Sequence, residues 1–482
     1  MLLAIWLAFF APLAKVVRFT ALAFLLAPVI GFAATVRSVE WTGDMDFVVR
    51  YRWELTDAER LAEFQRQGIK PITADAAIVT LVAQPEDMPT YRGANGEGFV
   101  TGPALSQDWE TSAPPLRWGH PCGGGYSQFA IVEPYAVTIE QRGSNEAVVC
   151  YDSQTGTERW AYEYANLFDE AMGGPGPRST PVIHDGAVYS VGAQGHFVKL
   201  SIADGQPVWQ AELLKDRGIP NTEWGITSSP LIVGDLVIVN PGGASGDGLE
   251  AYNTGSGQVV WSRPGLQEYA SKPDANNRAG YSTPMLATLH GVEQIVMFDG
   301  TGVRGYVPQT GDLLWEGRFR NGAGVNVAQP LIFDDGRVFV SCSYDVGSAM
   351  FQVSHADDKW QVEKLWESRD LRSKFSCCML VDGYIYGFDE GIFTCIDPET
   401  GERRWKKGRY GHGQMLATNG QILVHTEDGH LVLINPNPKQ LDEVTRFKTL
   451  DDPKNWNPPA LVRGRLFVRN HRDMACYDLT PQ

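Results

Sequence analysis

The side chains that could do chemistry in this sequence stand in short, mostly glycine-rich loops, each just ahead of an apolar segment. They combine cationic, aromatic and amide groups, which suit a carboxylate-bearing ligand or an acidic side chain of a partner. Arg178 is the strongest candidate, because a cation pairs well with a carboxylate. The alternative is that these loops only satisfy one another's hydrogen bonds. The candidate binding residues are Tyr126, Arg178, Trp224, Tyr281, Asn326, Lys374 and His412.

Motifs of common catalytic centres are absent from the sequence. It contains no His-Glu-x-x-His, no Gly-x-Ser-x-Gly, no phosphate-binding loop and no Cys-x-x-Cys-His for haem attachment. His425 and His430 flank a hairpin turn, and we expect both imidazoles to be solvated. We therefore assign no catalytic residue and no metal ligand.

A repeat indicates the elements that position these loops. Five segments end in Gly-x-x-x-Trp, and a degenerate copy ends at Trp366. The glycine supplies the positive φ of a tight turn. The indole is expected to lie flat between neighbouring units, as part of the core and not as a catalytic group. With Trp118, which stands alone upstream, the structural tryptophans are Trp118, Trp160, Trp209, Trp261, Trp315, Trp366 and Trp405.

The spacing of these residues predicts an all-β, eight-bladed β-propeller over residues 111–482, because a period of about 40–50 residues is typical of propeller blades. Each unit reads as four short strands joined by hairpin turns. Seven units are complete, the last of them with Phe447 in place of the tryptophan, and the tail supplies only three strands. We expect the strand around Trp118 to complete the eighth four-stranded antiparallel blade and close the ring. The candidate binding loops would then crowd around one end of the axis.

The repeated Asp-x-x-Thr-Gly-x-x-x-Trp, in eight blades, resembles the pyrroloquinoline quinone (PQQ)-like β-propeller repeat. Two branches share it: the quinoprotein alcohol dehydrogenases and a non-enzymatic group around the outer-membrane assembly factor BamB. The segment from Tyr91 to Gly98 looks like the Arg-Gly-x-Asn-x-x-Gly lead-in of tethered bacterial propellers, which favours the second branch. A fold of this kind hosts many functions.

The dehydrogenase branch implies PQQ held over Ca²⁺ on the propeller axis, with Glu, Asn and Asp around the metal and a tryptophan floor. That set is not placed in this sequence, so we expect no cofactor, with PQQ and Ca²⁺ as the alternative. The branch also often carries a vicinal disulfide, and Cys377-Cys378 is an adjacent pair. We expect these two residues to be packed near the axis instead.

The N-terminal region precedes the predicted propeller. Residues 1–34 are apolar apart from Lys15, Arg18 and a few small polar groups, and are read as a signal peptide or a membrane anchor. We favour an uncleaved anchor over cleavage, and the uncleaved segment could also form a short helical hairpin of residues 1–14 and 19–34. Either way, the basic pair stays cytoplasmic and the propeller lies outside the cytoplasm, in the envelope or secreted. Residues 35–110 read as a linker with a short helix at 56–67, where Thr56 and Glu59 form a capping box.

Charge and cysteine content limit the partners. With 41 Lys and Arg against 57 Asp and Glu, the net charge of −16 offers no footprint for nucleic acid. Seven cysteines leave at least one unpaired within a chain. We expect a monomeric, tethered binding or scaffolding propeller for an envelope protein or a small ligand. The alternatives are a PQQ-dependent alcohol dehydrogenase and a carbohydrate- or polymer-binding propeller.

Overall fold

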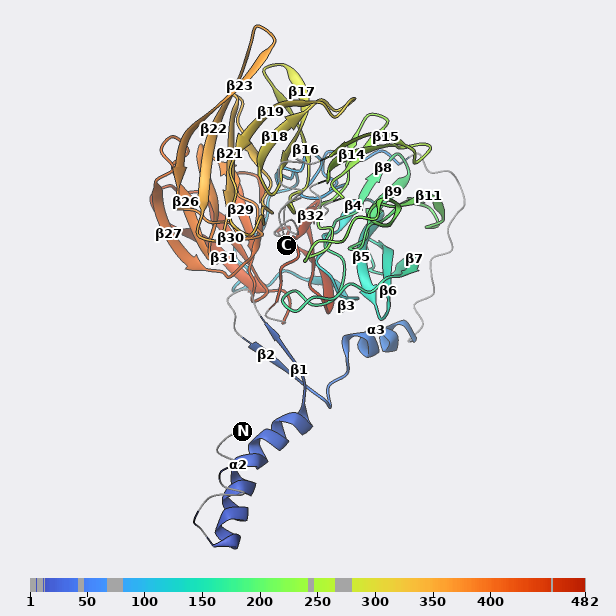
Figure 1. The fold of residues 1–482 in the computed structure, drawn as a ribbon, viewed down its shortest axis with the longest axis vertical. Helices are drawn as coiled ribbons and strands as arrows, with labels where there is room; N and C mark the ends of the chain where they lie inside the picture. Colours follow the sequence, from blue (N-terminus) through green and yellow to red (C-terminus); the bar gives the residue numbers. More distant parts are fainter. Residues whose placement is uncertain are drawn as a thin grey trace.

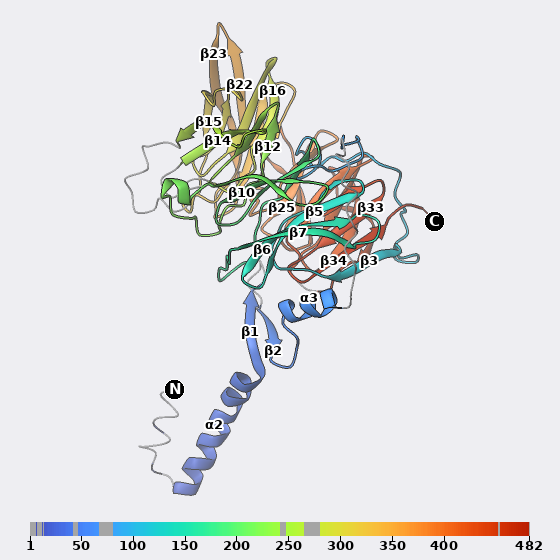
Figure 2. The same ribbon diagram turned by 90° about the vertical axis from the view of Figure 1, so that its right-hand side faces the viewer.

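Eight four-stranded antiparallel sheets surround a common axis in the computed structural model (Figures 1 and 2). The structure describes Trp6, Pro12 and residues 14–41, 47–66, 81–241, 247–264, 280–451 and 454–481. The first blade consists of β4 (Ala130–Val132), β5 (Tyr135–Arg142), β6 (Asn145–Asp152) and β7 (Glu158–Ala165), and the second of β8 (Val182–His184), β9 (Ala187–Val191), β10 (His196–Ser201) and β11 (Pro207–Glu212). The third consists of β12 (Leu231–Val233), β13 (Leu236–Val239), β14 (Asp247–Asn253) and β15 (Val259–Pro264), and the fourth of β16 (Met285–Leu289), β17 (Val292–Phe298), β18 (Gly302–Tyr306) and β19 (Leu313–Arg318). A 3-10 turn, η1 (Lys215–Arg217), follows β11.

The remaining blades complete the ring. They are β20 (Leu331–Ile332), β21 (Arg337–Cys342), β22 (Gly347–Ala356) and β23 (Lys359–Ser368); β24 (Met379–Val381), β25 (Tyr384–Asp389), β26 (Ile392–Ile396) and β27 (Arg403–Arg409); β28 (Gln414–Thr418), β29 (Gln421–His425), β30 (His430–Asn435) and β31 (Asp442–Lys448); and β32 (Ala460–Val462), β33 (Arg465–Arg469), β34 (Asp473–Asp478) and β3 (Leu116–Pro121). The predicted eight-bladed propeller is confirmed. We call the face that carries the loops leading into the innermost strands the front face, and the opposite face the rear face.

The last blade is closed by the strand around Trp118, as the sequence predicts. β3 pairs antiparallel with β34, with Trp118 opposite Cys476 and Gly119 opposite Ala475. The indole Nε1 of Trp118 donates to the carbonyl oxygen of Ser153 in the first blade, at 3.2 Å. One strand from the beginning of the propeller therefore joins the two ends of the ring.

The repeated tryptophans dock each blade on the next one. The Nε1 of Trp160 donates to the Ile202 carbonyl at 2.7 Å, and Trp261 does the same to Pro308 at 2.9 Å. Trp315 differs, because its indole donates to Gln294 within its own blade. The following copy of the repeat lacks the Gly turn and runs instead into the long β22–β23 hairpin, so the usual acceptor turn is missing.

The N-terminal elements lead from a helix to the propeller. Helix α2 (Lys15–Thr35) is 21 residues long with mean hydropathy 2.0 and is the described helix that is long and apolar enough to cross a membrane. Figure 2 shows α2 projecting away from the propeller, with β1 (Val36–Trp41) and β2 (Phe47–Tyr51) between them. Of the predicted hairpin of residues 1–14 and 19–34, most of the first arm lies outside the described residues.

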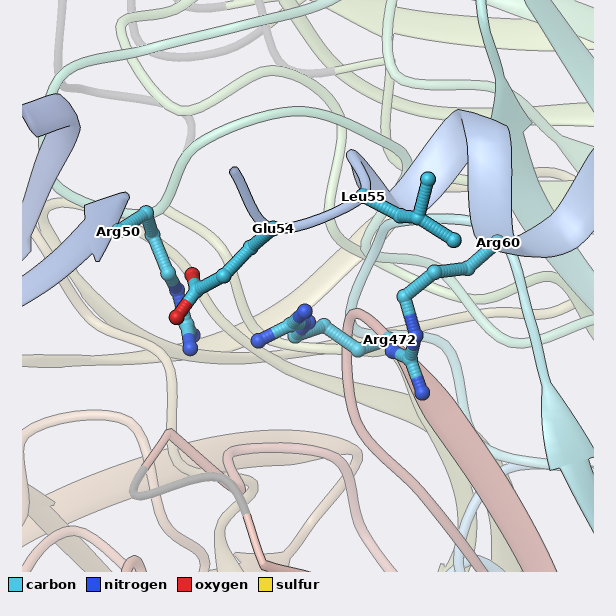
Figure 3. Close-up of a pocket in the computed structure, with 5 residues that line it drawn as sticks. All are labelled: Arg50, Glu54, Leu55, Arg60 and Arg472. Carbon is cyan, nitrogen blue, oxygen red and sulfur yellow. The ribbon is translucent and has the colours of Figure 1, made fainter. Parts of the chain in front are cut away.

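Helix α3 (Asp57–Arg66) contacts the closing strand β3. Its capping box is confirmed, since the Glu59 amide donates to Thr56 Oγ1 at 3.1 Å and the Thr56 amide donates to Glu59 Oε2 at 2.8 Å. Gln67, the last residue of the predicted helix, lies outside the described residues. Two guanidinium–carboxylate pairs at 2.7 Å, Arg60 with Asp473 and Arg472 with Asp57, fasten α3 to the last blade. Figure 3 shows the two arginines of these pairs, Arg60 on α3 and Arg472 in the β33–β34 hairpin.

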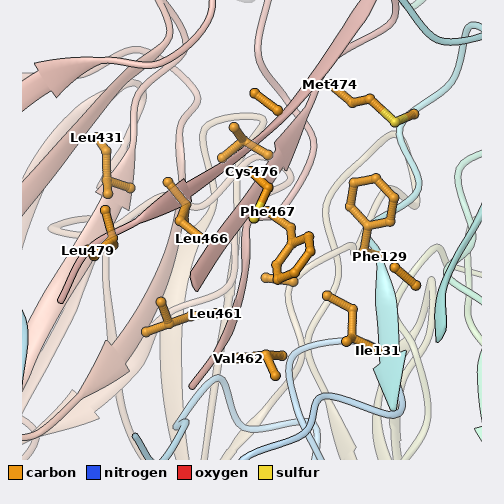
Figure 4. Packing of buried hydrophobic residues seen from close by; sticks show 14 of the residues in the cluster. Phe129, Ile131, Leu431, Leu461, Val462, Leu466, Phe467, Met474, Cys476 and Leu479 are labelled. Carbon is orange, nitrogen blue, oxygen red and sulfur yellow. The ribbon is translucent and has the colours of Figure 1, made fainter. Parts of the chain in front are cut away.

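The largest part of the hydrophobic core lies where the ring closes (Figure 4). Phe129 and Ile131 of the first blade face Phe467 of the last blade, and Leu431 of the seventh blade packs in the same cluster. Met88 and Trp109, which precede the propeller in the sequence, are buried in this cluster too. The segment before the propeller is therefore packed into its core, a feature that the sequence patterns did not indicate.

Candidate binding face of the propeller

The rear of the axis is closed by the chain itself. The Met88 amide and carbonyl pair with Ile131 of β4, and Gly98 and Val100 pair in the same way with Ala417 of β28. Between these two attachments the segment crosses from the first blade to the seventh, so the glycine-rich lead-in runs over the innermost strands. A ligand on the axis would have to approach from the front face.

Arg92 extends from this segment into the centre of the ring. Its amide donates to Gln128 Oε1 at 2.8 Å, and its guanidinium donates to the carbonyl oxygens of Glu97, Met415 and Cys378 at 2.8–3.5 Å. Only 3% of the side chain is exposed. The described residues thus place a guanidinium on the axis, in a cage of carbonyl groups.

Hydroxyl groups at the start of the innermost strands fix the front loops. The Gln128 amide donates to Thr180 Oγ1, the Thr180 amide to Ser229 Oγ, and the Ser229 amide to Thr283 Oγ1, at 2.8–3.1 Å. Each bond joins one blade to the next, so the first four front loops are held in a fixed register around the axis. Binding groups that are held rigidly lose little entropy when a ligand arrives.

Trp456 is the centre of an aromatic cluster on this face. Its ring centroid lies 5.3 Å from Tyr126 and 5.0 Å from Phe375, and the Phe375 ring lies 5.1 Å from the imidazole of His412. Lys454 places its ammonium 4.6 Å from the Trp456 ring, a cation–π contact. Front loops of the first and sixth blades therefore meet at the Trp456 indole of the eighth blade, and the loop of the seventh blade joins them through Phe375. The indole stays half-buried.

Glu427 holds this cluster from below. Its carboxylate accepts a hydrogen bond from the Trp456 indole at 2.7 Å and from the His412 amide at 2.9 Å. The Gly411 α-carbon lies so close that an added Cβ would stand 2.3 Å from Glu427 Oε2. The hairpin between His425 and His430 thus contributes a carboxylate that orients the front loops.

His425 corrects the expectation of a solvated imidazole. It is completely buried, and its Nε2 lies 3.0 Å from Thr449 Oγ1. Burial lowers the pKa of His425 to about 4, because the charged imidazolium would have to leave water. β29 is buried on both faces from Ile422 to His425, because neighbouring blades cover both sides of this strand, so no position in it is left for a solvated imidazole.

Arg178 is bound into its own loop. Its guanidinium pairs with Glu170 at 2.8 Å and lies 4.7 Å from the Phe168 ring and 5.6 Å from Tyr126. Glu170 in turn accepts from the amides of Met172 and Gly173. A ligand carboxylate at Arg178 would compete with Glu170, so the residue serves first to shape the loop.

Three of the other predicted residues, Trp224, Tyr281 and Asn326, form a second group on the front face. The Trp224 and Tyr281 rings meet edge to face at 5.5 Å, and the Tyr281 amide donates to the Asn326 carbonyl at 2.8 Å. Asn326 is completely buried, and its side-chain Nδ2 donates to the backbone carbonyl of Asp299 at 2.6 Å. Burial raises the pKa of the Tyr281 phenol, which therefore stays protonated. Lys374 is half-buried beside Phe375 in the front loop of the sixth blade.

Sequence reasoning selected Tyr126, Lys374 and His412 and the loops around them, but not the residues that join these loops. Trp456, Lys454 and Glu427 were passed over, although Trp456 is a tryptophan without the Gly-x-x-x spacing of the docking positions. That departure from the repeat was the one available signal. The contacts of Lys454 with the Met172 and Gly173 carbonyls, at 2.8 and 3.1 Å, join residues 281–282 positions apart and leave no local pattern.

The donor set for PQQ over Ca²⁺ is not gathered among the described residues. A hard cation needs several oxygen ligands, many of them carboxylates. The described part of the chain holds no group of three or more His, Cys, Asp or Glu that could bind a metal, and the guanidinium of Arg92 lies on the axis. Cys377 and Cys378 are free and buried near the axis, with Cys377 Sγ 3.6 Å from the Tyr91 hydroxyl.

The fold and the repeat define an eight-bladed propeller of the PQQ-like class. The profile of a family described as outer membrane protein assembly factor BamB matches residues 106–268 and 144–407, which together cover more than half of the chain. The chain belongs to this family. No curated protein sequence matches it.

Solved structures show the same fold at low sequence identity. BamB from Moraxella catarrhalis is 16% identical, with a TM-score of 0.51 over 75% of this chain and 97% of that one. A quinohemoprotein alcohol dehydrogenase from Comamonas testosteroni is 12% identical, with a TM-score of 0.57 over 88% of this chain and 85% of that one. An assembly factor and a dehydrogenase share this fold, so the fold alone assigns no activity.

Proposed function

We propose that this chain is a membrane-tethered binding propeller of the bacterial cell envelope that presents its front face to a protein partner and does no chemistry of its own. The asymmetry of the two faces carries the proposal. The rear of the axis is closed by the chain's own lead-in, whereas the front face gathers aromatic rings around Trp456. The Trp456 and Phe375 rings are half-buried, and the buried ammonium of Lys454 lies against the Trp456 ring. Aromatic and basic side chains dominate the energetics of protein interfaces.

The family and the N-terminus support this assignment. The family is described by a role in outer membrane protein assembly. In α2, the basic residues Lys15 and Arg18 stand at the beginning of the helix, and cations remain on the cytoplasmic side of a membrane. The propeller then lies on the outer side of the cytoplasmic membrane, where it can meet envelope proteins as a monomer.

Site-specific photo-crosslinking in intact cells tests the proposal. A photoreactive residue at Lys374 on the front face is expected to give a discrete protein adduct, and the adduct should fall several-fold when Trp456→Ala is added. The matched position is Lys359, an exposed lysine at the hairpin between β22 and β23 on the rear side of its blade. Equal adducts from both positions, or no effect of Trp456→Ala, would refute a front-face interface.

A second measurement addresses the alternative activity. Calorimetry of the full chain in detergent with PQQ and Ca²⁺ is expected to show no metal-dependent binding. Tight binding that requires Ca²⁺ would replace the scaffold role by a dehydrogenase, which an alcohol panel with an artificial electron acceptor would then examine.

A further inference from the structure

An exposed tyrosine lies on the front face at the fifth blade. Tyr344 is in the turn between β21 and β22, and 40% of its side chain is exposed. The innermost strand of a blade begins at the front face, and the second strand runs back toward it. The turn between the second and third strands therefore lies on the front face. Tyrosine is among the residues that contribute most to protein interfaces.

The turn that carries Tyr344 has an unfavourable backbone conformation. Tyr344 and Asp345 have φ angles of 61° and 63°, in the left-handed region that favours glycine. A bulky side chain in this region costs free energy, and residues of this kind are concentrated at binding sites, where the surrounding structure holds them. The strained turn is consistent with a role of the Tyr344 ring at the surface.

Hydrogen bonds from neighbouring loops hold this turn in place. The guanidinium of Arg369 donates to the Asp345 carbonyl at 2.6 Å, and Ser343 Oγ donates to Glu390 Oε1 at 2.5 Å. Glu390 belongs to the corresponding front turn of the sixth blade, between β25 and β26. A ring on a turn that is already fixed loses little entropy when a partner binds.

Tyr344 adjoins the second aromatic group of the front face. Burial raises the pKa of the Tyr281 phenol, and the neighbouring Glu223 and Tyr344 raise it further. The Tyr281 ring meets Trp224 edge to face at 5.5 Å, and Glu223 precedes Trp224 in the chain with an exposed side chain. Front segments of the third, fourth and fifth blades therefore come together at Tyr344.

Carboxylates accompany the exposed ring. Burial, followed by the charges of Glu223 and Glu390, raises the pKa of its phenol. Arg372, a cation of this region, is paired with Asp389 at 2.7 Å and with Asp345 at 3.7 Å. Within the part of the chain that the structure describes, Glu223 and Glu390 form no ion pair. An aromatic face and carboxylates both attract a cation, so this corner differs in character from the cluster around Trp456.

We propose that Tyr344 receives an arginine side chain of the protein partner, with the guanidinium over the ring and the carboxylates of Glu223 and Glu390 beside it. We call these three residues the cation site. The inference rests on the front-face binding in the proposed function, and it identifies the bound segment of the partner as basic. Arginine suits the site better than lysine, because its planar guanidinium stacks on an aromatic ring and also bonds to carboxylates. The net charge of −16 adds a longer-range attraction for such a segment.

A peptide probe tests this chemistry on the full chain in detergent. Binding of a fluorescent peptide of alternating glycine and arginine is measured by anisotropy at physiological salt. We expect Glu223→Gln and Tyr344→Asn to weaken binding several-fold, since asparagine keeps the left-handed turn but removes the ring. Tyr344→Phe keeps the aromatic face and should bind nearly as the wild type does.

The matched control for the peptide measurement is Glu293→Gln. Glu293 is exposed at the rear end of β17, and its loss should leave binding unchanged. An equal loss in Glu293→Gln and Glu223→Gln would show that the peptide responds only to overall charge, and would overturn the cation site. So would a wild-type chain that does not bind the peptide, or binding that Tyr344→Asn does not change.

The crosslink from Lys374 in intact cells separates this site from the proposed function. We expect its adduct to fall several-fold with Glu223→Gln or Tyr344→Asn, to persist with Glu293→Gln, and to contain arginine in the partner's crosslinked segment. An adduct that depends on Trp456 but not on Tyr344 would leave the front-face interface in place and overturn the cation site. If no adduct forms, the proposed function fails, and the peptide measurement alone decides whether the cation site exists.

Discussion

Gly205 lies flat against the indole ring of Trp160, so that a Cβ on Gly205 would stand 2.6 Å from Cε3 of the ring. The same relationship joins Gly156 to Trp118 and Gly257 to Trp209 in other blades. Each turn glycine therefore serves the tryptophan of the preceding blade, whereas the tryptophan four residues later serves the following blade. Each Gly-x-x-x-Trp segment therefore makes two contacts between blades. Its glycine is the surface on which the tryptophan of the preceding blade packs, and its own tryptophan packs on the following blade.

Gly205→Ala should destabilise the propeller by more than the conformational cost of its positive φ. The φ of +70° strains any side chain, and a Cβ adds overpacking against Trp160, which costs about 1–3 kcal/mol. Gly383→Ala is the matched control, because its φ is +78° and nothing lies within 4 Å of its Cβ position. Urea unfolding of both variants measures the difference. Equal losses would mean that the turn, and not the indole, requires glycine.

Arg92→Ala should loosen the rear closure of the ring. The carbonyl oxygens of Glu97, Met415 and Cys378 would lose their donor, and each buried polar group left unpaired costs about 1–3 kcal/mol. We expect proteinase K to cut residues 84–105 in the variant at concentrations that spare the wild-type chain. Arg117→Ala, which removes an exposed arginine paired with Asp478, should leave this segment protected. Equal cleavage of both variants would argue against a role of Arg92 in holding residues 84–105 across the rear of the axis.

The blades could be predicted from sequence because their signals are local. A turn glycine and a tryptophan four residues later recur wherever one blade meets the next, and β3 was recognised as an orphan copy of the same strand. The rear closure has no such signal. Met88 acquires its environment from Leu461, whose amide donates to the Met88 sulfur, and these residues are 373 positions apart.

The candidate site was predictable only in part, for the same reason. Topology places all front loops at one end of the axis, so loops that contain Tyr126 and His412 could be selected from the repeat alone. The choice of partners depends on tertiary contacts, such as Arg178 with Glu170 and Trp456 with Glu427. From the sequence alone, a cation in a loop looks like a ligand-binding group, because the carboxylate that neutralises it in the folded chain cannot be identified.

His425 should make the propeller less stable in mild acid. Its pKa is about 4 in the folded chain, against about 6.5 for an ordinary imidazole, so the unfolded chain takes up a proton that the folded chain does not. Stability contributed by the neutral imidazole is present above pH 6.5 and falls as the pH drops toward 4, by up to about 3 kcal/mol. Urea midpoints measured between pH 7 and 4.5 should fall less steeply for His425→Gln than for the wild-type chain. Parallel slopes would show that other groups carry the acid sensitivity.

The seven thiols should be unreactive in the native protein and fully reactive after unfolding. All seven cysteines are buried and free, and burial raises the pKa of Cys378 to about 12, so almost no thiolate is present at pH 8. Titration with Ellman's reagent without reductant is expected to give close to zero thiols in buffer and seven in guanidinium chloride. Five thiols in the denatured chain would reveal one disulfide, and a Cys377→Ser variant that then gives six would place it at the Cys377-Cys378 pair. In that case the Tyr91 hydroxyl would face a disulfide and not a thiol, and the protein would share the vicinal disulfide that is often found in the dehydrogenase branch.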